Sequence, residues 1–267
     1  MIAGKEQKIV GQKKGVLVTG AGSGIGQATA LECARKGYRV AILGRAVPKL
    51  QSTRELLQEY TDDTLLLQAD VSDAAQMQDV YNRIDSSWGH LDAVVANAGI
   101  NGVWAPLEHM EPEEWDDTIR INLRGTFLTV KYAIPFLKKS KGGIVITSSE
   151  LGTRVFTRYG CTAYCSTKAA QVAFGKQQAV ELAQFKIRVN TVCPGWIDTD
   201  ITVTQTFKNT DYFKQWVEYP YGVIPLTDGE LPSPDCVAKV IAFLLSEDAS
   251  HITGTEVYID GGESLVL

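Results

Sequence analysis

The sequence predicts an α/β fold, a doubly wound parallel sheet of seven strands with helices on both faces. Short apolar runs alternate with longer stretches of helical periodicity along the chain. Parallel neighbours in a sheet need crossover connections, which helices of this length provide. Four glycines also follow the first apolar run directly, at 20–26, as in the first strand-to-helix turn of many such folds.

The expected elements follow one another in chain order. Strands are expected at 15–19, 39–43, 65–69, 91–96, 143–147, 187–193 and 256–259. Helices are expected at about 24–35, 73–88, 113–139, 162–185 and 234–246, with Ser72 and Asp73 as N-cap candidates for the second. A break is expected near 123–125, and Pro135 should kink its helix or mark a turn.

One domain spanning 1–267 is expected, because no repeat, charge run or linker divides the chain. Its least regular stretch, about 198–235, is rich in proline and aromatic residues, and a substrate loop or lid is expected at about 196–232. These aromatic residues include Phe207, Tyr212, Phe213, Trp216, Tyr219 and Tyr221. Ligands of such sheets bind at the carboxyl ends of the strands, so the loops there should build the site.

Composition excludes several classes of protein. With 45% hydrophobic and 21% charged residues, the chain is not disordered throughout, and its net charge of −5 argues against a nucleic-acid partner. No run of about 18 apolar residues occurs, and the start of the chain lacks the apolar segment of a signal peptide. A soluble, cytoplasmic protein without a membrane partner is therefore expected. Five cysteines, sparse and odd in number, indicate reduced thiols, and no metal site is expected.

The glycine cluster TGAGSGIG, at 19–26, suits a pyrophosphate. Glycine permits a tight turn and close approach of the backbone, and the following helix offers free N–H groups and a favourable dipole. Ile25 stands where the third glycine of the usual dinucleotide fingerprint would be, and no Lys-Ser or Lys-Thr follows as in a P-loop. A purely structural turn is the alternative.

Tyr164 and Lys168 are four residues apart on an expected helix, so their side chains share one face. A free tyrosine has a pKa of about 10. A nearby ammonium should lower that pKa and match the phenol to proton transfer with an alcohol or carbonyl. A core tyrosine with a solvated lysine is the alternative, but Ser149 at the end of the preceding strand favours the chemical interpretation.

In this order the motifs resemble those of the classical short-chain dehydrogenase/reductase family, from about residue 15 to 262. The glycine cluster matches TGxxxGxG, and Asn97-Ala98-Gly99 matches the family's NNAG, with Ala96 in place of the first Asn. Further matches are Asn122, Ser149, the YxxxK pair Tyr164 and Lys168, Pro194-Gly195 and Thr253-Gly254. The resemblance implies a Rossmann-type fold and an NAD(P)(H)-dependent oxidoreductase that interconverts a secondary alcohol and a ketone.

The resemblance also implies roles for four catalytic residues. Tyr164 would be the general acid/base, Lys168 would tune it and hold the nicotinamide ribose, and Ser149 would donate a hydrogen bond to the reacting oxygen. Asn122 would hold a water that links Lys168 to solvent. Ser148 is an alternative to Ser149, but Gly152 follows Ser149 by three residues, as the family's SxxG pattern asks. The gap of 15 residues from Ser149 to Tyr164 is longer than usual, so this loop should bulge toward the substrate.

NADP(H) is expected ahead of NAD(H). NAD-preferring relatives carry an Asp at the end of the second strand, where Gly44 and Arg45 stand here. Arg45 can form two charge-assisted hydrogen bonds to a 2′-phosphate, although a surface arginine without this role is the alternative. Besides Arg45, Tyr164 and Lys168, the expected cofactor contacts are Gly20, Ser23, Gly24, Ile25, Gly26, Asp70, Val71, Asn97, Ala98, Gly99, Pro194, Gly195, Ile197 and Thr199.

Expected substrate contacts are Ser149, Glu150, Tyr159 and Trp196. The aromatic residues suit an apolar or cyclic carbonyl and equally a sugar or polyol, and Glu150 could bind hydroxyls. One alternative is a reductase of 3-ketoacyl groups on a carrier protein, for which Lys138, Lys139 and Lys141 form the only basic cluster. Another is an inactive dinucleotide sensor, against which Tyr164 and Lys168 argue. The resemblance further implies a small-molecule substrate and a homotetramer or homodimer.

Overall fold

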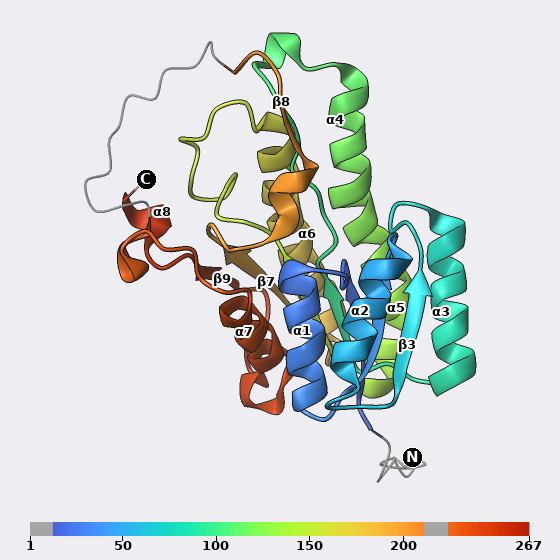
Figure 1. Ribbon diagram of the computed structural model, residues 1–267. Helices are drawn as coiled ribbons and strands as arrows, with labels where there is room; N and C mark the ends of the chain where they lie inside the picture. The colour runs from blue at the N-terminus through green and yellow to red at the C-terminus, as the bar shows by residue number, and fades with distance from the viewer. Residues whose placement is uncertain (1–12, 211–223, 267) are drawn as a thin grey trace.

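The computed structural model describes residues 13–210 and 224–266. Seven parallel strands form its central sheet, in the order β3-β2-β1-β4-β6-β7-β9 (Figure 1). They are β1 (Gly15–Thr19), β2 (Arg39–Gly44), β3 (Thr64–Gln68), β4 (Ala93–Ala96), β6 (Gly143–Thr147), β7 (Arg188–Pro194) and β9 (Glu256–Ile259). The predicted doubly wound sheet is confirmed, and each predicted strand takes part in it.

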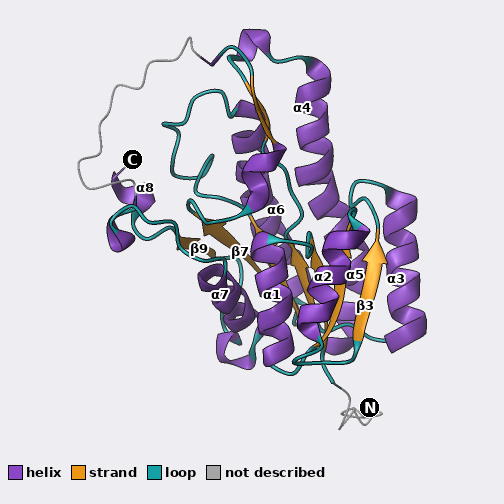
Figure 2. Ribbon diagram, in the orientation of Figure 1, coloured by secondary structure: helices purple, strands orange, loops and turns teal. Residues whose placement is uncertain are grey.

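Helices cover both faces of the sheet (Figure 2). One layer contains α1 (Gly24–Arg35), α2 (Val47–Leu57) and α7 (Asp235–Leu245), and the other contains α3 (Ala74–Trp88), α5 (Gly125–Ser140) and α6 (Thr162–Ala183). A hydrophobic core lies on each face of the sheet, and successive strand residues pack into the two cores alternately. Leu17 packs in one core, and Val16 and Val18 pack in the other. A strand that is buried on both faces reads as a continuous apolar run, which is why the sequence revealed these strands.

Besides the short 3₁₀ helices and a short C-terminal helix, one helix and two strands of the fold were not predicted. Helix α2 is mostly polar and buries only Leu50, Thr53 and Leu57, so its periodicity is weak. Strands β5 (Gly102–Trp104) and β8 (Gln205–Phe207) pair in parallel as a separate two-stranded sheet. Each has three residues, too few for an alternating pattern to be recognised. Their pairing joins the loop after β4 to the segment after β7.

The long helical stretch predicted at 113–139 is divided. Helix α4 (Pro112–Ile119) passes through a π-helical segment, η2 (Arg120–Arg124), into α5. The expected break is therefore present as a π-helical segment. The expected turn at Pro135 is wrong, because α5 continues past it to Ser140. Proline removes one helical hydrogen bond, and burial of neighbouring Ala133, Phe136 and Leu137 offsets that loss.

The predicted substrate loop, 196–232, is described except for 211–223. Tyr212, Phe213, Trp216, Tyr219 and Tyr221 lie outside the described residues. The described part contains a 3₁₀ helix, η3 (Asp200–Thr204), then β8, and a second 3₁₀ helix, η5 (Pro225–Thr227). A short C-terminal helix, α8 (Glu263–Val266), follows β9. Within the described ranges, no helix combines the length and apolar character needed to cross a membrane.

Candidate active site

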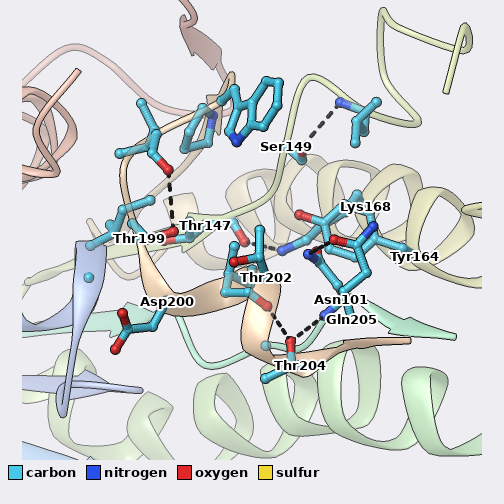
Figure 3. A pocket seen from close by; sticks show the side chains of 18 of the residues that line it. Asn101, Thr147, Ser149, Tyr164, Lys168, Thr199, Asp200, Thr202, Thr204 and Gln205 are labelled. Carbon is cyan, nitrogen blue, oxygen red and sulfur yellow. Dashed lines mark hydrogen bonds between the residues drawn. The ribbon is translucent and has the colours of Figure 1, made fainter. Parts of the chain in front are cut away.

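A cavity of about 540 Å³ lies at the carboxyl ends of the central strands. The glycine turn after β1, the loops after β4, β6 and β7, and helix α6 all contribute to its wall (Figure 3). This is the edge of the sheet at which the strand order predicts a ligand site. The wall contains most of the predicted residues: Gly20, Ser23, Gly24, Ile25, Asn97, Ala98, Gly99, Ser149, Glu150, Tyr164, Lys168, Pro194, Gly195, Trp196, Ile197 and Thr199.

The glycine turn is packed so closely that side chains are excluded from it. A Cβ atom at Gly26 would lie 2.2 Å from the Gly20 carbonyl oxygen and 2.7 Å from Nδ2 of Asn97. Nδ2 of Asn97 donates to the carbonyl of Thr19 at 3.1 Å, which ties the turn to the loop after β4. Helix α1 starts here, and its N-cap residue Ser23 makes no side-chain cap. Its first N–H groups are thus free of a side-chain acceptor, as an approaching phosphate requires.

The loop after β7 forms the facing wall. A Cβ atom at Gly24 would lie 3.0 Å from Cγ2 of Thr199, so the two loops meet over the helix start. Lys49 of α2 also lines the cavity, and its Nζ lies 3.1 Å from Oδ2 of Asp200 in η3. This pair was not predicted. Its members are 151 residues apart and belong to no motif, so no local signal was available.

Ser148 and Ser149 both line the cavity but make different contacts. Oγ of Ser148 donates to the main-chain carbonyl of Lys168 at 2.8 Å. Oγ of Ser149 accepts a hydrogen bond from the N–H of Leu151 at 3.1 Å and makes a side-chain hydrogen bond with Tyr164. The hydroxyl of Ser149 therefore meets the tyrosine, whereas that of Ser148 fastens β6 to α6.

Tyr164 and Lys168 lie one helical turn apart, as predicted. Nζ of Lys168 is 5.3 Å from the centre of the Tyr164 ring and donates to the carbonyl of Thr147 at 3.0 Å (Figure 3). Burial lowers the pKa of Lys168 to about 8. Burial also raises the pKa of Tyr164 above its ordinary value, and the hydrogen bond with Ser149 offsets part of that rise. The lowering expected from Lys168 is wrong as a net effect here, because desolvation of the phenolate dominates.

Asn122 lies in the π-helical segment behind the cavity and is fully buried. Its side-chain amide exchanges two hydrogen bonds with the backbone of Ile100, at 2.8 and 2.9 Å. Its main-chain carbonyl accepts from Nε2 of Gln171 at 2.9 Å and from Oγ1 of Thr126 at 2.7 Å. Asn122 therefore joins the loop after β4 to α5 and α6.

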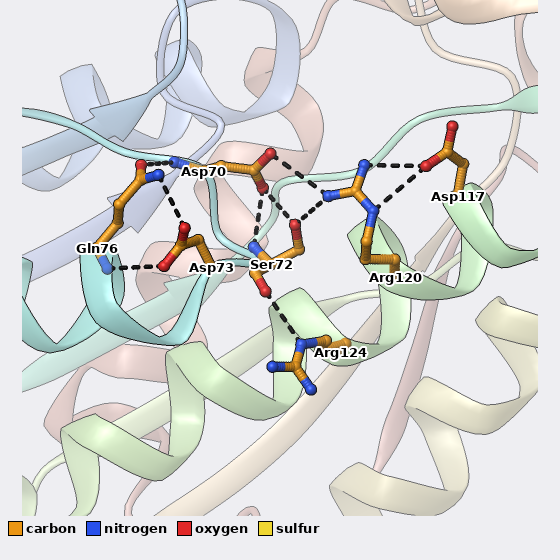
Figure 4. Close-up of polar contacts among 7 residues, drawn as sticks. All are labelled: Asp70, Ser72, Asp73, Gln76, Asp117, Arg120 and Arg124. Carbon is orange, nitrogen blue, oxygen red and sulfur yellow. Dashed lines mark hydrogen bonds and ion pairs between the residues drawn. The ribbon is translucent and has the colours of Figure 1, made fainter.

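Gly26, Arg45, Asp70 and Val71 do not line the cavity. Gly26 lies inside the turn, and Arg45 is exposed just beyond β2. Asp70 is held from the side by hydrogen bonds from Ser72, at 2.6 and 2.9 Å, and by Arg120, whose Nη1 is 3.6 Å away (Figure 4). Burial alone would raise the pKa of Asp70, but these contacts bring it below its ordinary value. They fix the loop after β3 beside the cavity.

Tyr159 does not reach this cavity. It lines a second one, of about 870 Å³, together with Cys161 and Cys165. Gly160 explains the direction of the loop: its φ is +81°, and a Cβ atom there would lie 2.9 Å from the main-chain nitrogen of Ala105. Tyr159 therefore does not line the first cavity in this conformation of the loop, and its contact with a substrate stays a prediction.

Two carboxyl groups meet at the substrate end of the cavity. Glu150 follows Ser149, and Glu263 begins α8, and they are 3% and 1% exposed. Oε2 of Glu263 accepts from the N–H of Trp196 at 2.9 Å, and Oε1 lies 3.5 Å from Nη2 of Arg158. A Cβ atom at Gly195 would lie 2.7 Å from Oε2 of Glu263, so only glycine permits this approach. Glu263 and Arg158 were not predicted, since neither carries a sequence signal.

Most of the remaining unpredicted residues of the wall come from β5, β8 and the segments that precede these two strands. Trp104 and Phe207 of β5 and β8 pack edge to face, with ring centres 5.9 Å apart. Asn101 donates through its N–H to Oγ1 of Thr204 at 3.0 Å, and its Nδ2 lies 3.4 Å from Oε1 of Gln205 (Figure 3). This part of the wall is therefore both aromatic and polar.

Comparisons with known proteins agree with this geometry. The family model described as enoyl-(acyl carrier protein) reductase matches residues 20–264. A 3-oxoacyl-(acyl-carrier-protein) reductase of Thermotoga maritima is 36% identical over 250 residues, covering 92% of this chain and 96% of the relative. Levodione reductase of Leifsonia aquatica is 33% identical over 256 residues, covering 93% of both chains.

Solved structures are similar over the same length. A 3-ketoacyl-ACP reductase of Sinorhizobium meliloti has a TM-score of 0.90 and 47% identity, covering 95% of this chain and all of that one. A 3-ketoacyl-(acyl-carrier-protein) reductase of Brucella melitensis, complexed with NADH, has a TM-score of 0.82 and 33% identity, covering 95% and 99%.

The fold and the site together define an NAD(P)-dependent oxidoreductase. The chain belongs to the short-chain dehydrogenase/reductase family.

Proposed function

We propose that this enzyme interconverts a secondary alcohol and a ketone of a small molecule, with Tyr164 as general acid/base. The observation that carries the proposal is the meeting of Ser149, Tyr164 and Lys168 in one cavity with the glycine turn. The turn suits a dinucleotide because its glycines exclude side chains where a pyrophosphate would approach. Bound NAD(P)(H) supplies or accepts the hydride.

The chain's own residues handle the proton and the oxygen. In reduction the hydroxyl of Tyr164 donates its proton to the substrate oxygen, and in oxidation the phenolate takes it back. Ser149 supports that oxygen, because its Oγ already accepts from the N–H of Leu151 and can direct its own proton outward. The ammonium of Lys168, held by the Thr147 carbonyl, provides positive charge beside the phenol.

We assign Asn122 a positioning role in this mechanism. Its amide fastens Ile100, and its main-chain carbonyl already accepts two hydrogen bonds, from Gln171 and Thr126. A carbonyl oxygen has two lone pairs, so a relay water on this atom would have to displace one of these donors. The water-binding role of Asn122 stays a prediction.

We favour NADP(H) as the cofactor, with NAD(H) as the alternative. Gly44 and Arg45 end the second strand without a carboxylate, and Arg45 is exposed and able to reach a 2′-phosphate. Lys49, on the helix that follows Arg45, adds a second cation and lines the cavity. The relative from Brucella melitensis, whose structure is a complex with NADH, supports the alternative.

Reduction of 3-ketoacyl groups on a carrier protein is the second candidate, since several relatives bear that name. The basic cluster expected to receive an acidic carrier does not favour it. Lys138, Lys139 and Lys141 lie at the end of α5, where β6 begins, whereas the cavity lies where the strands end. Nζ of Lys138 also stacks on the Phe185 ring, 3.8 Å from its centre. An inactive sensor is disfavoured because the catalytic groups are assembled.

Assembly as a homotetramer or homodimer and a location in the cytoplasm complete the proposal. Exposed apolar side chains support assembly: Val180 on α6 is 77% exposed and Leu265 on α8 is 78% exposed. Burying such side chains against a second copy would be favourable. Sedimentation should show a dimer or tetramer at micromolar concentration, and a monomer alone would contradict this part.

The proposed reaction is tested by oxidation of NADPH and NADH across a panel of ketones and 3-ketoacyl thioesters. The wild type should turn over at least one small ketone, and Tyr164→Phe should lose turnover by roughly 10²–10⁴-fold. Tyr159→Phe is the matched control, since that phenol lies in the other cavity. Unchanged turnover in Tyr164→Phe would overturn the proposed mechanism.

A further inference from the structure

Two cysteine thiols lie in contact at the start of helix α6, beside the second cavity. Cys161 is the N-cap residue of α6, and Cys165 follows one turn later. Their Sγ atoms are 3.2 Å apart, and both thiols are free. The N–H of Cys165 donates to the carbonyl of Cys161 at 2.8 Å, and the Cys161 thiol donates to the carbonyl of Arg158 at 3.0 Å. These contacts hold the two sulfurs next to one another.

The second cavity gives small molecules access to this pair. Both cysteines line its wall, and so do the exposed side chains of Leu107 and Phe156, so the cavity of about 870 Å³ reaches the surface. Cys165 is partly exposed, whereas Cys161 lies deeper in the wall. A reagent as small as hydrogen peroxide can therefore reach the pair while α6 stays folded.

The surroundings of Cys161 favour its thiolate. The hydrogen bond with Cys165 lowers the pKa of Cys161 below its ordinary value, burial opposes this effect, and the positive charge of Arg158 adds to it. The N-terminus of a 22-residue helix also stabilises a negative charge. The same hydrogen bond and burial raise the pKa of Cys165. Cys161 is thus the sulfur that reacts first with an oxidant, while Cys165 stays a neutral thiol beside it.

The backbone of Cys165 packs against groups of the active site. Tyr164 precedes it directly in α6. A Cβ atom at Gly152 would lie 2.3 Å from the carbonyl oxygen of Cys165, so the loop that begins at Ser149 packs directly on this residue. Movement of Cys165 would therefore displace both Tyr164 and the loop that carries Ser149.

A bond between the two sulfurs requires such a movement. A disulfide holds its sulfur atoms about 2.05 Å apart and its Cβ atoms about 3.5–4.5 Å apart. Residues four apart on a helix have their Cβ atoms about 5–6 Å apart. The first turn of α6 must therefore contract by about 1 Å or more when the bridge forms. A displacement of about 1 Å at a reacting group can cost about a hundredfold in rate.

We propose that Cys161 and Cys165 form an oxidation site for hydroperoxides, and that the disulfide formed there displaces Tyr164 and slows turnover reversibly. The bridge is independent of the proposed function, and only its effect on turnover rests on that function.

The oxidation takes two steps. The Cys161 thiolate attacks one oxygen of hydrogen peroxide, the O–O bond breaks, and a sulfenic acid and hydroxide form. The sulfur of Cys165 then attacks the sulfenic sulfur: the S–S bond forms, the S–O bond breaks, and the hydroxyl group leaves as water with the thiol proton of Cys165. Two electrons pass from the sulfurs to the peroxide, and the hydroxide takes up the proton that Cys161 released. A dithiol reductant reverses the bridge by thiol–disulfide exchange.

The test uses the full chain, reduced and then freed of reductant, with hydrogen peroxide as the probe. Trypsin cleaves after Arg158 and Lys168, so both cysteines fall in one peptide, 159–168. After treatment and alkylation, this peptide should carry no alkyl group and should be lighter by two hydrogen atoms. Turnover of the best ketone substrate should fall about 10–100-fold in parallel, and dithiothreitol should restore it.

Two variants locate the effect. The double variant Cys161→Ser/Cys165→Ser should keep its turnover after the same treatment. Cys236→Ser is the matched control, because Cys236 is partly exposed as Cys165 is but lies on α7. This control should lose turnover as the wild type does. The mass of the wild-type peptide tests the bridge even if the double variant does not fold.

The outcomes separate the bridge from its effect on turnover. Alkylation of both cysteines after treatment, or a sulfinic acid on Cys161 alone, would overturn the bridge. A bridged peptide with unchanged turnover, or an equal loss of turnover in the double variant, would overturn the coupling to Tyr164. If no alcohol, ketone or thioester is turned over at all, the proposed function fails, while the mass of the peptide still decides whether the bridge forms.

Discussion

The hydroxyl of Ser148 donates a hydrogen bond of 2.8 Å to the main-chain carbonyl of Lys168. This contact occupies Ser148 in joining β6 to α6 and leaves Ser149 to meet Tyr164. Of two adjacent serines, one therefore supports the catalytic helix and the other faces the reacting groups. The family's SxxG spacing pointed to Ser149, and the hydrogen bonds supply a physical reason for that choice.

Ser149→Ala should lower kcat by about 10²–10³-fold, because it removes a donor aimed at the reacting oxygen. Ser148→Ala is the matched control: we expect less than a tenfold loss of kcat and a loss of about 0.5–1.5 kcal/mol in stability. Steady-state kinetics and denaturant unfolding of both variants check this. A larger catalytic loss in Ser148→Ala than in Ser149→Ala would reverse the assignment.

Lys168→Met should abolish turnover and stabilise the ligand-free protein at neutral pH. Burial lowers the folded-state pKa of Lys168 to about 8, against about 10.4 for an unperturbed lysine in the unfolded chain. The unfolded state therefore holds the proton more tightly. Below about pH 8 the wild type is destabilised by the full free-energy cost of burying the charged Lys168 side chain. We expect a gain on the order of 1–3 kcal/mol at pH 7, reduced by the loss of the hydrogen bond to Thr147.

The sign of the pH dependence distinguishes this explanation from a packing effect. As the pH rises from about 8 to about 10.5, the wild type should gain stability relative to Lys168→Met, and the difference should narrow. Unfolding by urea at pH 7, 9 and 10.5 measures it. A difference that stays constant over this range would mean that charge burial is not its cause.

Arg45→Asp should change the cofactor preference. A charge-assisted contact to a 2′-phosphate contributes about 1.5–3 kcal/mol, so kcat/KM with NADPH should fall roughly 10–150-fold, while the value with NADH stays within about threefold. Arg54→Asp, on the exposed side of α2, is the control for the change of charge. Equal losses of kcat/KM with both cofactors would show that Arg45 does not bind the 2′-phosphate.

Gly26→Ala should weaken cofactor binding and destabilise the fold. Its new Cβ would lie 2.2 Å from the Gly20 carbonyl oxygen, and such overpacking costs about 1–3 kcal/mol. Gly44→Ala is the matched control, because its Cβ would meet Leu50 at an ordinary 3.4 Å. Calorimetric titration with NADP⁺ and thermal unfolding should show the loss in Gly26→Ala alone. Normal binding by Gly26→Ala would contradict the role given to the turn.

Most of the fold could be predicted because its signals are local. Buried parallel strands such as β1 and β6 are continuous apolar runs, and the glycine turn and the Tyr164–Lys168 spacing are short patterns. Elements that depend on distant partners were missed. Strands β5 and β8 have three residues each and exist because they pair with one another across about 100 residues of chain.

The same contrast between local signals and distant contacts separates the catalytic residues from the other residues around the cavity. The sequence by itself determined the α/β class and the order of the strands along the chain, because strand and helix periodicity are local signals. It also identified Tyr164 and Lys168 from their helical spacing, and Ser149 from its place after a strand and from the family's SxxG pattern. Only the tertiary structure decided that Glu150 meets Glu263, that Lys49 meets Asp200, and that Tyr159 turns away. These contacts join segments far apart in the chain, and packing, not local spacing, determines which of them form.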